Sequence, residues 1–160
     1  MASSFSPSEL RWRWCAFDAL SVHELQAIYM ARQLVFAIEQ QCIYLDADGC
    51  DAQSFHLAAW SDRQQMPLAY ARVVAPGVKY AEPSIGRVIT TEAARGSGLG
   101  RDLVRRAVAH TREAYPGCGI RISAQSRLER FYGGHGFQIV GERYLEDGIP
   151  HTEMLLAPPP

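Results

Sequence analysis

RVITTEAARGSGLGRDLVRRAV, residues Arg87–Val108, predicts a strand, a tight turn and a helix in that order. The strand covers about 85–91, and the helix runs from about 98 to 114 before Tyr115-Pro116-Gly117 ends it. Between the two elements the chain places three alternating glycines, Gly96, Gly98 and Gly100. Three glycines at this junction indicate that the backbone itself contacts a ligand, because glycine has no side chain to keep a ligand away.

The charge around the glycines favours an anionic ligand. A helix N-terminus leaves its first N–H groups unpaired and carries a partial positive charge. Between Arg95 and Arg106 there are four arginines and one acidic residue, Asp102, in a chain whose net charge is -1. Because the positive charge gathers where the free N–H groups point, we predict that this corner binds a diphosphate.

The spacing of the glycines separates three phosphate-binding motifs. A Walker loop needs a GK[ST] end, which this corner lacks. A dinucleotide-binding GxGxxG would need glycine at Arg101 or Leu103. The third pattern, [RQ]xxGx[GA], is filled by Arg95, Gly98 and Gly100.

Following the strand IGRVITT, this pattern resembles the GCN5-related N-acetyltransferase (GNAT) superfamily. The stretch LERFYGGHGFQIVGE, residues Leu128–Glu142, is similar to the FYxxxGF element of the same superfamily. VFAIEQQCIYLDADG, IGRVI and EDGIPH further resemble its ElaA-like branch. The resemblance implies a mixed α/β (α+β-like) fold, in which helices flank a central mixed, mostly antiparallel β-sheet.

The resemblance also implies the co-substrate and part of the site. Acetyl-CoA would lie along the strand before the turn, with pantetheine amides pairing to Val88, Ile89 and Thr90. Its pyrophosphate would meet the backbone of the turn, formed by Arg95, Gly96, Ser97, Gly98, Leu99, Gly100 and Arg101. Tyr132 matches the family's general acid, which protonates the departing CoA thiolate. The alternative for Tyr132 is a ring that only packs on the sheet.

The residue that removes the proton from an amine acceptor has no motif of its own. Glu39 ends an apolar helix stripe and either faces the cleft or is solvated. His151, in EDGIPH, is either a proton shuttle or an ordinary turn histidine. Arg87 either faces the acetyl end or pairs with an acid. Glu142 and Glu146 are weaker candidates.

The acidic segment DADGCD, residues Asp46–Asp51, is not an EF-hand, because the sixth and twelfth positions are Asp51 and Leu57. Its carboxylates either border the acceptor groove and attract a cationic amine, or lie in a solvated loop. Cys42, Cys50 and His56 match no zinc spacing, so no metal is expected.

The rest of the chain predicts alternating strands and helices. Ser21 and Glu24 form a capping box at the start of a helix whose apolar positions reach Phe36. A short helix is expected over 127–135. The further strands are expected at 10–17, 55–60, 68–75, 120–125, 137–145 and 152–156.

Composition sets the outer limits of the function. At 160 residues and near-neutral charge, the chain is expected to be one domain, with loose tails at about 1–8 and 157–160. We expect no nucleic-acid or membrane partner, reduced cysteines and a cytoplasmic location. The predicted function is transfer of acetyl from acetyl-CoA to an amine of a small molecule or protein. A non-catalytic CoA sensor, another acyl donor and a non-amine acceptor stay open, as does the choice between a monomer and a homodimer.

Overall fold

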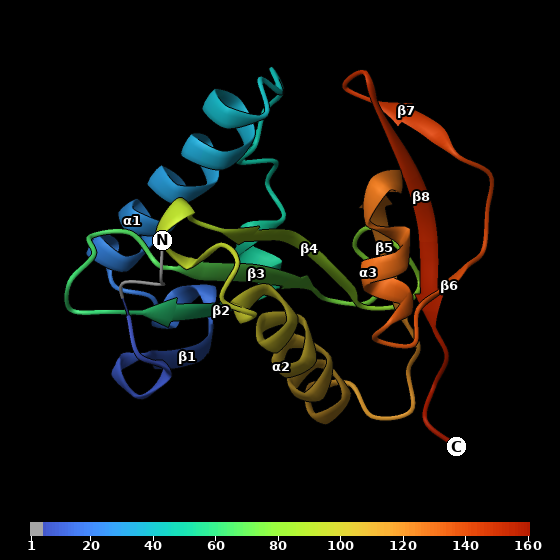
Figure 1. Cartoon of the computed structure of the whole chain (residues 1–160). Coiled ribbons are helices and arrows are strands. Elements are labelled where there is room, and N and C mark those ends of the chain that lie inside the picture. Colours follow the sequence, from blue (N-terminus) through green and yellow to red (C-terminus); the bar gives the residue numbers. More distant parts are fainter. Residues whose placement is uncertain (1–4) are drawn as a thin grey trace.

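The computed structural model describes residues 5–160, and its centre is an eight-stranded sheet (Figure 1). The strand order is β1-β2-β3-β4-β5-β8-β6, with β7 also paired to β8. Only β4 and β5 run parallel, so the predicted mixed, mostly antiparallel sheet is confirmed. The strands are β1 (Arg11–Ala16), β2 (Ser54–Trp60), β3 (Ala69–Val74), β4 (Ser84–Thr90), β5 (Ile120–Gln125), β6 (Gln138–Ile139), β7 (Tyr144–Glu146) and β8 (Ile149–Leu156).

Helices cover both faces of the sheet. The main helices are α1 (Val22–Arg32), α2 (Leu99–Ala114) and α3 (Glu129–Gly133). Alternate residues of β2 and β3 belong to two separate core clusters, because successive side chains of a strand point to opposite faces. Leu103 of α2 packs in one cluster and Ile28 of α1 in the other, so β3 is buried throughout.

The first helix begins as predicted and then changes its winding. The Glu24 N–H donates to Ser21 Oγ at 3.0 Å, and the Ser21 N–H donates to the Glu24 carboxylate at 2.8 Å. After Arg32 the chain continues as a π-helix, η3 (Gln33–Glu39). The wider turn shifts the phase of the side chains, and such segments often occur at functional sites.

The C-terminal strands differ from the prediction. The prediction of one continuous strand over 137–145 is wrong. Within this stretch two short strands, β6 and β7, pair separately with β8, and residues 138–148 are exposed. Between them Gly141 interrupts the apolar pattern. The β7–β8 turn places Asp147 and Gly148 at φ values of 51° and 76°, as an Asp-Gly hairpin turn requires.

Two irregularities of β4 create the site. Its only register contact with β5 is Ser84 with Arg121, so the strands diverge beyond that point. Toward β3, the register passes from Tyr70–Ile89 to Arg72–Gly86, and a bulge therefore sets two β4 residues opposite one β3 residue.

The predicted tails are partly described. Residues 1–4 lie outside the described part of the chain, whereas Phe5 packs against the core. A short 3₁₀ turn, η1 (Pro7–Glu9), precedes β1, and residues 157–160 have no regular structure.

Candidate active site

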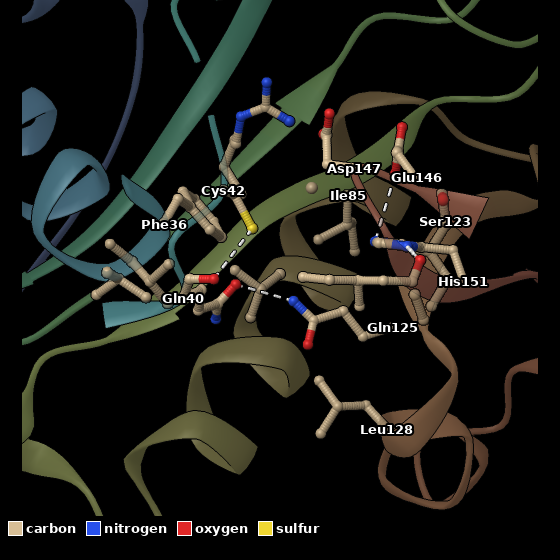
Figure 2. Close-up of a pocket in the computed structure, with 18 of the residues that line it drawn as sticks. Phe36, Gln40, Cys42, Ile85, Ser123, Gln125, Leu128, Glu146, Asp147 and His151 are labelled. Atoms are coloured by element: carbon tan, nitrogen blue, oxygen red, sulfur yellow. Dashed lines mark hydrogen bonds and ion pairs between the residues drawn. The ribbon is translucent and has the colours of Figure 1, made fainter. Parts of the chain in front are cut away.

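A pocket of about 980 Å³ lies where β4 and β5 separate (Figure 2). Residues of β4, β5, the π-helix, α3 and the β7–β8 hairpin line it. Figure 2 shows Gln40 and Cys42 on one side and Gln125 and His151 on the other. The Gln125 amide donates to Gln40 Oε1 at 3.0 Å, so these two side chains bridge the pocket.

Most of the predicted site residues meet in this pocket. Its lining includes Val88, Ile89, Thr90, Arg95, Glu39, Tyr132 and His151. The rest of the turn, residues 96–101, does not line it. Leu99 is buried in the core, so only its backbone is available to a ligand. Glu142 is exposed and does not line the pocket, whereas Glu146 does.

The glycine turn presents bare backbone at the start of a 16-residue helix. Gly98, the N-cap of α2, has φ 84°, and Gly96 has φ 77°. These values favour glycine because a Cβ would strain the backbone. Across residues 5–160, no backbone acceptor contacts the N–H groups of Gly96, Gly98 or Gly100. The turn therefore has the donors that a diphosphate requires.

Arg95 lies between the turn and the pocket. Its Nη2 donates to Glu39 Oε2 at 2.5 Å and to the Thr90 carbonyl at 2.9 Å. Thus the predicted phosphate ligand Arg95 and the predicted base Glu39 form one ion pair across the groove.

Tyr132 is a buried ring that also reaches the pocket. It is 7% exposed, its ring contacts that of Phe137 edge-on, and it lines the pocket. Burial raises the pKa of its phenol to about 12, against an opposing effect of Arg127. The phenol therefore keeps its proton at neutral pH, as a general acid must.

A hydrogen bond to the backbone fixes the tautomer of neutral His151. Its Nδ1 lies 2.8 Å from the Ile149 carbonyl, which can only accept a hydrogen bond. The proton of neutral His151 is therefore on Nδ1, and Nε2 is free to accept another. Glu146 Oε2 lies 3.4 Å from that nitrogen.

The acidic segment is not a solvated loop. Asp46, Asp48 and Asp51 all bind arginines, and of the three Asp48 lines the pocket. Burial alone would raise the pKa of Asp51, but hydrogen bonds from Arg32 lower it overall. Arg87 pairs with Asp46 at 2.8 Å, the second of its two predicted alternatives.

Sequence reasoning missed several pocket residues. Cys42, Tyr44, Gln40, Gln125 and Asp147 all line it. Gln40, Cys42 and Tyr44 stand in VFAIEQQCIYLDADG and Asp147 in EDGIPH, stretches that indicated only the branch, and Gln125 ends a plain strand pattern. In the described chain no group of three or more His, Cys, Asp or Glu is placed to hold a metal ion.

The comparison with known protein families decides what this arrangement is. Residues 49–157 match the acetyltransferase (GNAT) domain. This chain is a member of the GNAT acetyltransferase family. Membership places this GNAT chain among the acyl-CoA-dependent transferases.

Related proteins support the same assignment along almost the whole chain. The GNAT chain is 43% identical to a UPF0039 protein of Synechocystis over 95% of its own length and 98% of the relative's. It is 35% identical to the ElaA protein of Escherichia coli, over 91% and 95%. The predicted ElaA-like branch is therefore confirmed.

Solved structures agree. An acyl-CoA N-acyltransferase from Pseudomonas aeruginosa superimposes with a TM-score of 0.88 at 39% identity, covering 92% of this chain and 99% of that one. E. coli ElaA superimposes with a TM-score of 0.85 at 34% identity, covering 91% and 98%. No helix within residues 5–160 of this GNAT chain is long and apolar enough to cross a membrane.

Proposed function

We propose that this chain transfers an acetyl group from acetyl-CoA to an amine by direct attack on the thioester. The observation that carries the proposal is the separation of β4 from β5. It opens a pocket that is lined by Arg95, the first residue of the glycine turn with its unpaired N–H groups, and by His151, a candidate proton acceptor. A single pocket can therefore hold both reactants in contact, which supplies much of the rate enhancement.

The donor would occupy the β4 side of the pocket. The pantetheine arm would pair with the exposed backbone of Val88, Ile89 and Thr90, and the pyrophosphate would meet the turn Arg95–Arg101. The N-terminus of α2 and the unpaired N–H groups support this placement. The pantetheine amides can take the place of the missing ladder partner, because β4 has no register contact with β5 beyond Ser84.

The chemistry needs no covalent intermediate on the enzyme. The amine nitrogen forms a bond to the thioester carbon, and the carbon–sulfur bond then breaks to release CoA. The β4 bulge turns backbone groups away from the ladder, so an N–H near Val88 is available for the oxyanion. Tyr132 would give its proton to the departing thiolate.

The proton of the attacking amine would go to His151. Its free Nε2 lines the pocket, whereas the alternative base, Glu39, is paired with Arg95. Glu146 lies beside Nε2 and would stabilise the imidazolium that forms.

Release of the free CoA thiol tests the proposal directly. The chain is incubated with acetyl-, propionyl- and longer acyl-CoAs, with and without a panel of small and peptide amines. Amine-dependent release that is fastest with acetyl-CoA is expected. Equal or faster release with a longer acyl chain would make the enzyme a different acyltransferase. Tight acetyl-CoA binding without acceptor-dependent release would make it a CoA sensor.

The proposal extends to the setting of the reaction. Residues 1–160 would act as one domain in the cytoplasm, on a small-molecule or protein amine, without nucleic acid, a membrane or a resident metal. The acceptor's identity and the oligomeric state stay open.

A further inference from the structure

Three arginines and three aspartates form a closed ring of alternating charges beside the pocket. Each aspartate contacts two arginines. The ring runs Arg32–Asp46–Arg87–Asp48–Arg72–Asp51 and back to Arg32. We call these six residues the arginine–aspartate ring. It has no net charge, and its closest N–O distances are 2.7 Å.

The arginine–aspartate ring joins four separate parts of the chain. Arg32 comes from α1, Arg72 from β3 and Arg87 from β4, and the aspartates come from the irregular segment 40–53. Arg32 and Arg72 are 0% and 1% exposed. Breaking one of these buried ion pairs would leave an uncompensated charge in the interior, which is strongly destabilising. The ion pairs therefore hold the segment 40–53 against the sheet.

Arg87 differs from the other two arginines because it sits at the β4 bulge. Its φ is 51°, a left-handed value that is strained for a residue with a side chain. Contacts must therefore hold it there. Its Nε donates to Asp46 Oδ1 at 2.8 Å, its Nη2 lies 3.2 Å from Asp48 Oδ2, and its guanidinium lies over the Tyr44 ring.

These contacts link the β4 side of the pocket to the wall that contains Cys42 and Tyr44. The strained residue immediately precedes Val88, where the acyl-CoA would lie. The aspartates belong to the same segment as Cys42 and Tyr44, which line the wall opposite β5. A shift of the Arg87 side chain would therefore move the bulge and that wall relative to each other.

We infer that Arg87 is a positioning residue, which uses Asp46 and Asp48 to hold the β4 bulge in the shape that acyl transfer requires. This inference rests on the proposed function. It predicts an effect on turnover rather than on co-substrate affinity. The glycine turn that would bind the pyrophosphate forms no ion pair with the arginine–aspartate ring in the described structure.

The test compares Arg87→Ala, Arg87→Lys and a matched control, Arg121→Ala. Arg121 lies on the neighbouring strand β5 and also contacts two carboxylates, Glu82 at 2.9 Å and Glu153 at 3.3 Å, but it does not line the pocket. Each variant is measured for melting temperature, acetyl-CoA Kd by calorimetry, and kcat for CoA release with the best amine or with water.

We expect Arg87→Ala to lower kcat by about 10²-fold, as a misplaced reactive centre does, with little change in acetyl-CoA Kd. Arg121→Ala should keep kcat close to the wild-type value. Arg87→Lys keeps a cation beside both aspartates without the two-armed contact, so its kcat should lie between those of wild type and Arg87→Ala. Should Arg87→Ala not fold, Arg87→Lys against Arg121→Ala still decides the question.

Two results would overturn the inference. One is a loss of kcat no larger than that of Arg121→Ala. The other is a rise in acetyl-CoA Kd that matches the loss of activity, which would make Arg87 a direct ligand of the co-substrate. A wild-type chain that binds no acetyl-CoA would instead overturn the proposed function, and the inference with it.

Discussion

Arg95 donates at the same time to the Glu39 carboxylate, at 2.5 Å, and to the Thr90 carbonyl, at 2.9 Å. One side chain thus contacts the last residue of the donor strand and the last residue of the π-helix. If the Arg95 guanidinium also binds the CoA pyrophosphate, alongside the backbone N–H groups of the turn, the phosphate and Glu39 compete for it. The ion pair then opposes co-substrate binding instead of supporting it.

Glu39→Gln should therefore increase affinity for CoA. Both partners are partly exposed, and pairs of this kind contribute about 0.2–1 kcal/mol, so we expect Kd to fall by about 1.4- to fivefold. Glu92→Gln is the matched control, because Glu92 is an exposed carboxylate in the same corner and forms no ion pair in the described structure. Calorimetric titration with CoA measures both. Equal gains in the two variants would assign the effect to overall charge and not to Arg95.

Two glycine substitutions should have opposite effects on stability. Gly98→Ala places a side chain at φ 84° and should lower the free energy of unfolding by about 1–2 kcal/mol. Gly100→Ala adds a Cβ that meets Thr90 Cγ2 at an ordinary 3.7 Å, and it should stabilise α2 by about 0.5–1 kcal/mol. Calorimetric melting measures both changes.

The same pair tests the phosphate site. Gly98→Ala should weaken CoA binding by about tenfold or more, the equivalent of one lost hydrogen bond to a charged group. Gly100→Ala fits the [GA] position of the motif and should bind CoA almost normally. Wild-type affinity in folded Gly98→Ala would mean that the phosphates bind elsewhere.

Tyr132→Phe should lower kcat by about 10²-fold, the lower end of the range for general acids, because a thiolate leaves comparatively easily. The pKa of Tyr132 is raised to about 12, so its proton stays in place through pH 10. The ratio of wild-type to variant kcat should accordingly be constant from pH 7 to 10. A ratio that approaches one above pH 9 would show that the phenol ionises earlier, and a ratio of one throughout would remove its catalytic role.

The stability of the fold should decrease in mild acid because of His56. This residue is 2% exposed, and its Nε2 must donate to the Asp51 carbonyl, so its Nδ1 accepts from the Tyr70 hydroxyl at 2.7 Å. Burial lowers its pKa in the folded state. Its contribution is therefore complete above the unfolded pKa of about 6.5 and is lost as the pH falls through the folded value.

His56→Gln can make the same two hydrogen bonds without titrating. Urea unfolding at several pH values between 5 and 7.5 measures the free energy of unfolding. As the pH falls, this free energy should decrease less steeply for His56→Gln than for wild type, by at most about 1.4 kcal/mol per pH unit. His110 and His135, whose pKa values are also lowered by burial, account for the remaining slope. An unchanged slope would mean that His56 takes up its proton without loss of stability.

The sequence predicted those features that depend on near neighbours. Strand alternation, the Ser21 capping box and the glycine motif are signals within a few residues, and the structure contains all three. The π-helix was not predicted, because its apolar positions also suit an ordinary α-helix. The break after β6 was missed for a similar reason. The apolar residues Ile139 and Val140 extend the strand pattern in the sequence, but both side chains are exposed in the structure.

The arginine–aspartate ring was not predicted, because its partners lie 14 to 41 positions apart in the sequence. One signal did exist. Arg72 stands within AYARVV, a strand buried on both faces, and a buried guanidinium needs acidic partners. The segment DADGCD was the nearest source of three carboxylates, and combining the two observations would have paired them.

The divergence of β4 and β5 also gives the sheet two edges inside the molecule. Sheet edges commonly invite pairing with other chains and aggregation, and proteins protect them with charges, prolines or coverings. Here the two edges face each other across the pocket, and the π-helix, α3 and the β7–β8 hairpin also line it. Both edges therefore lie inside the molecule, where the proposed pantetheine arm would take the place of a pairing strand.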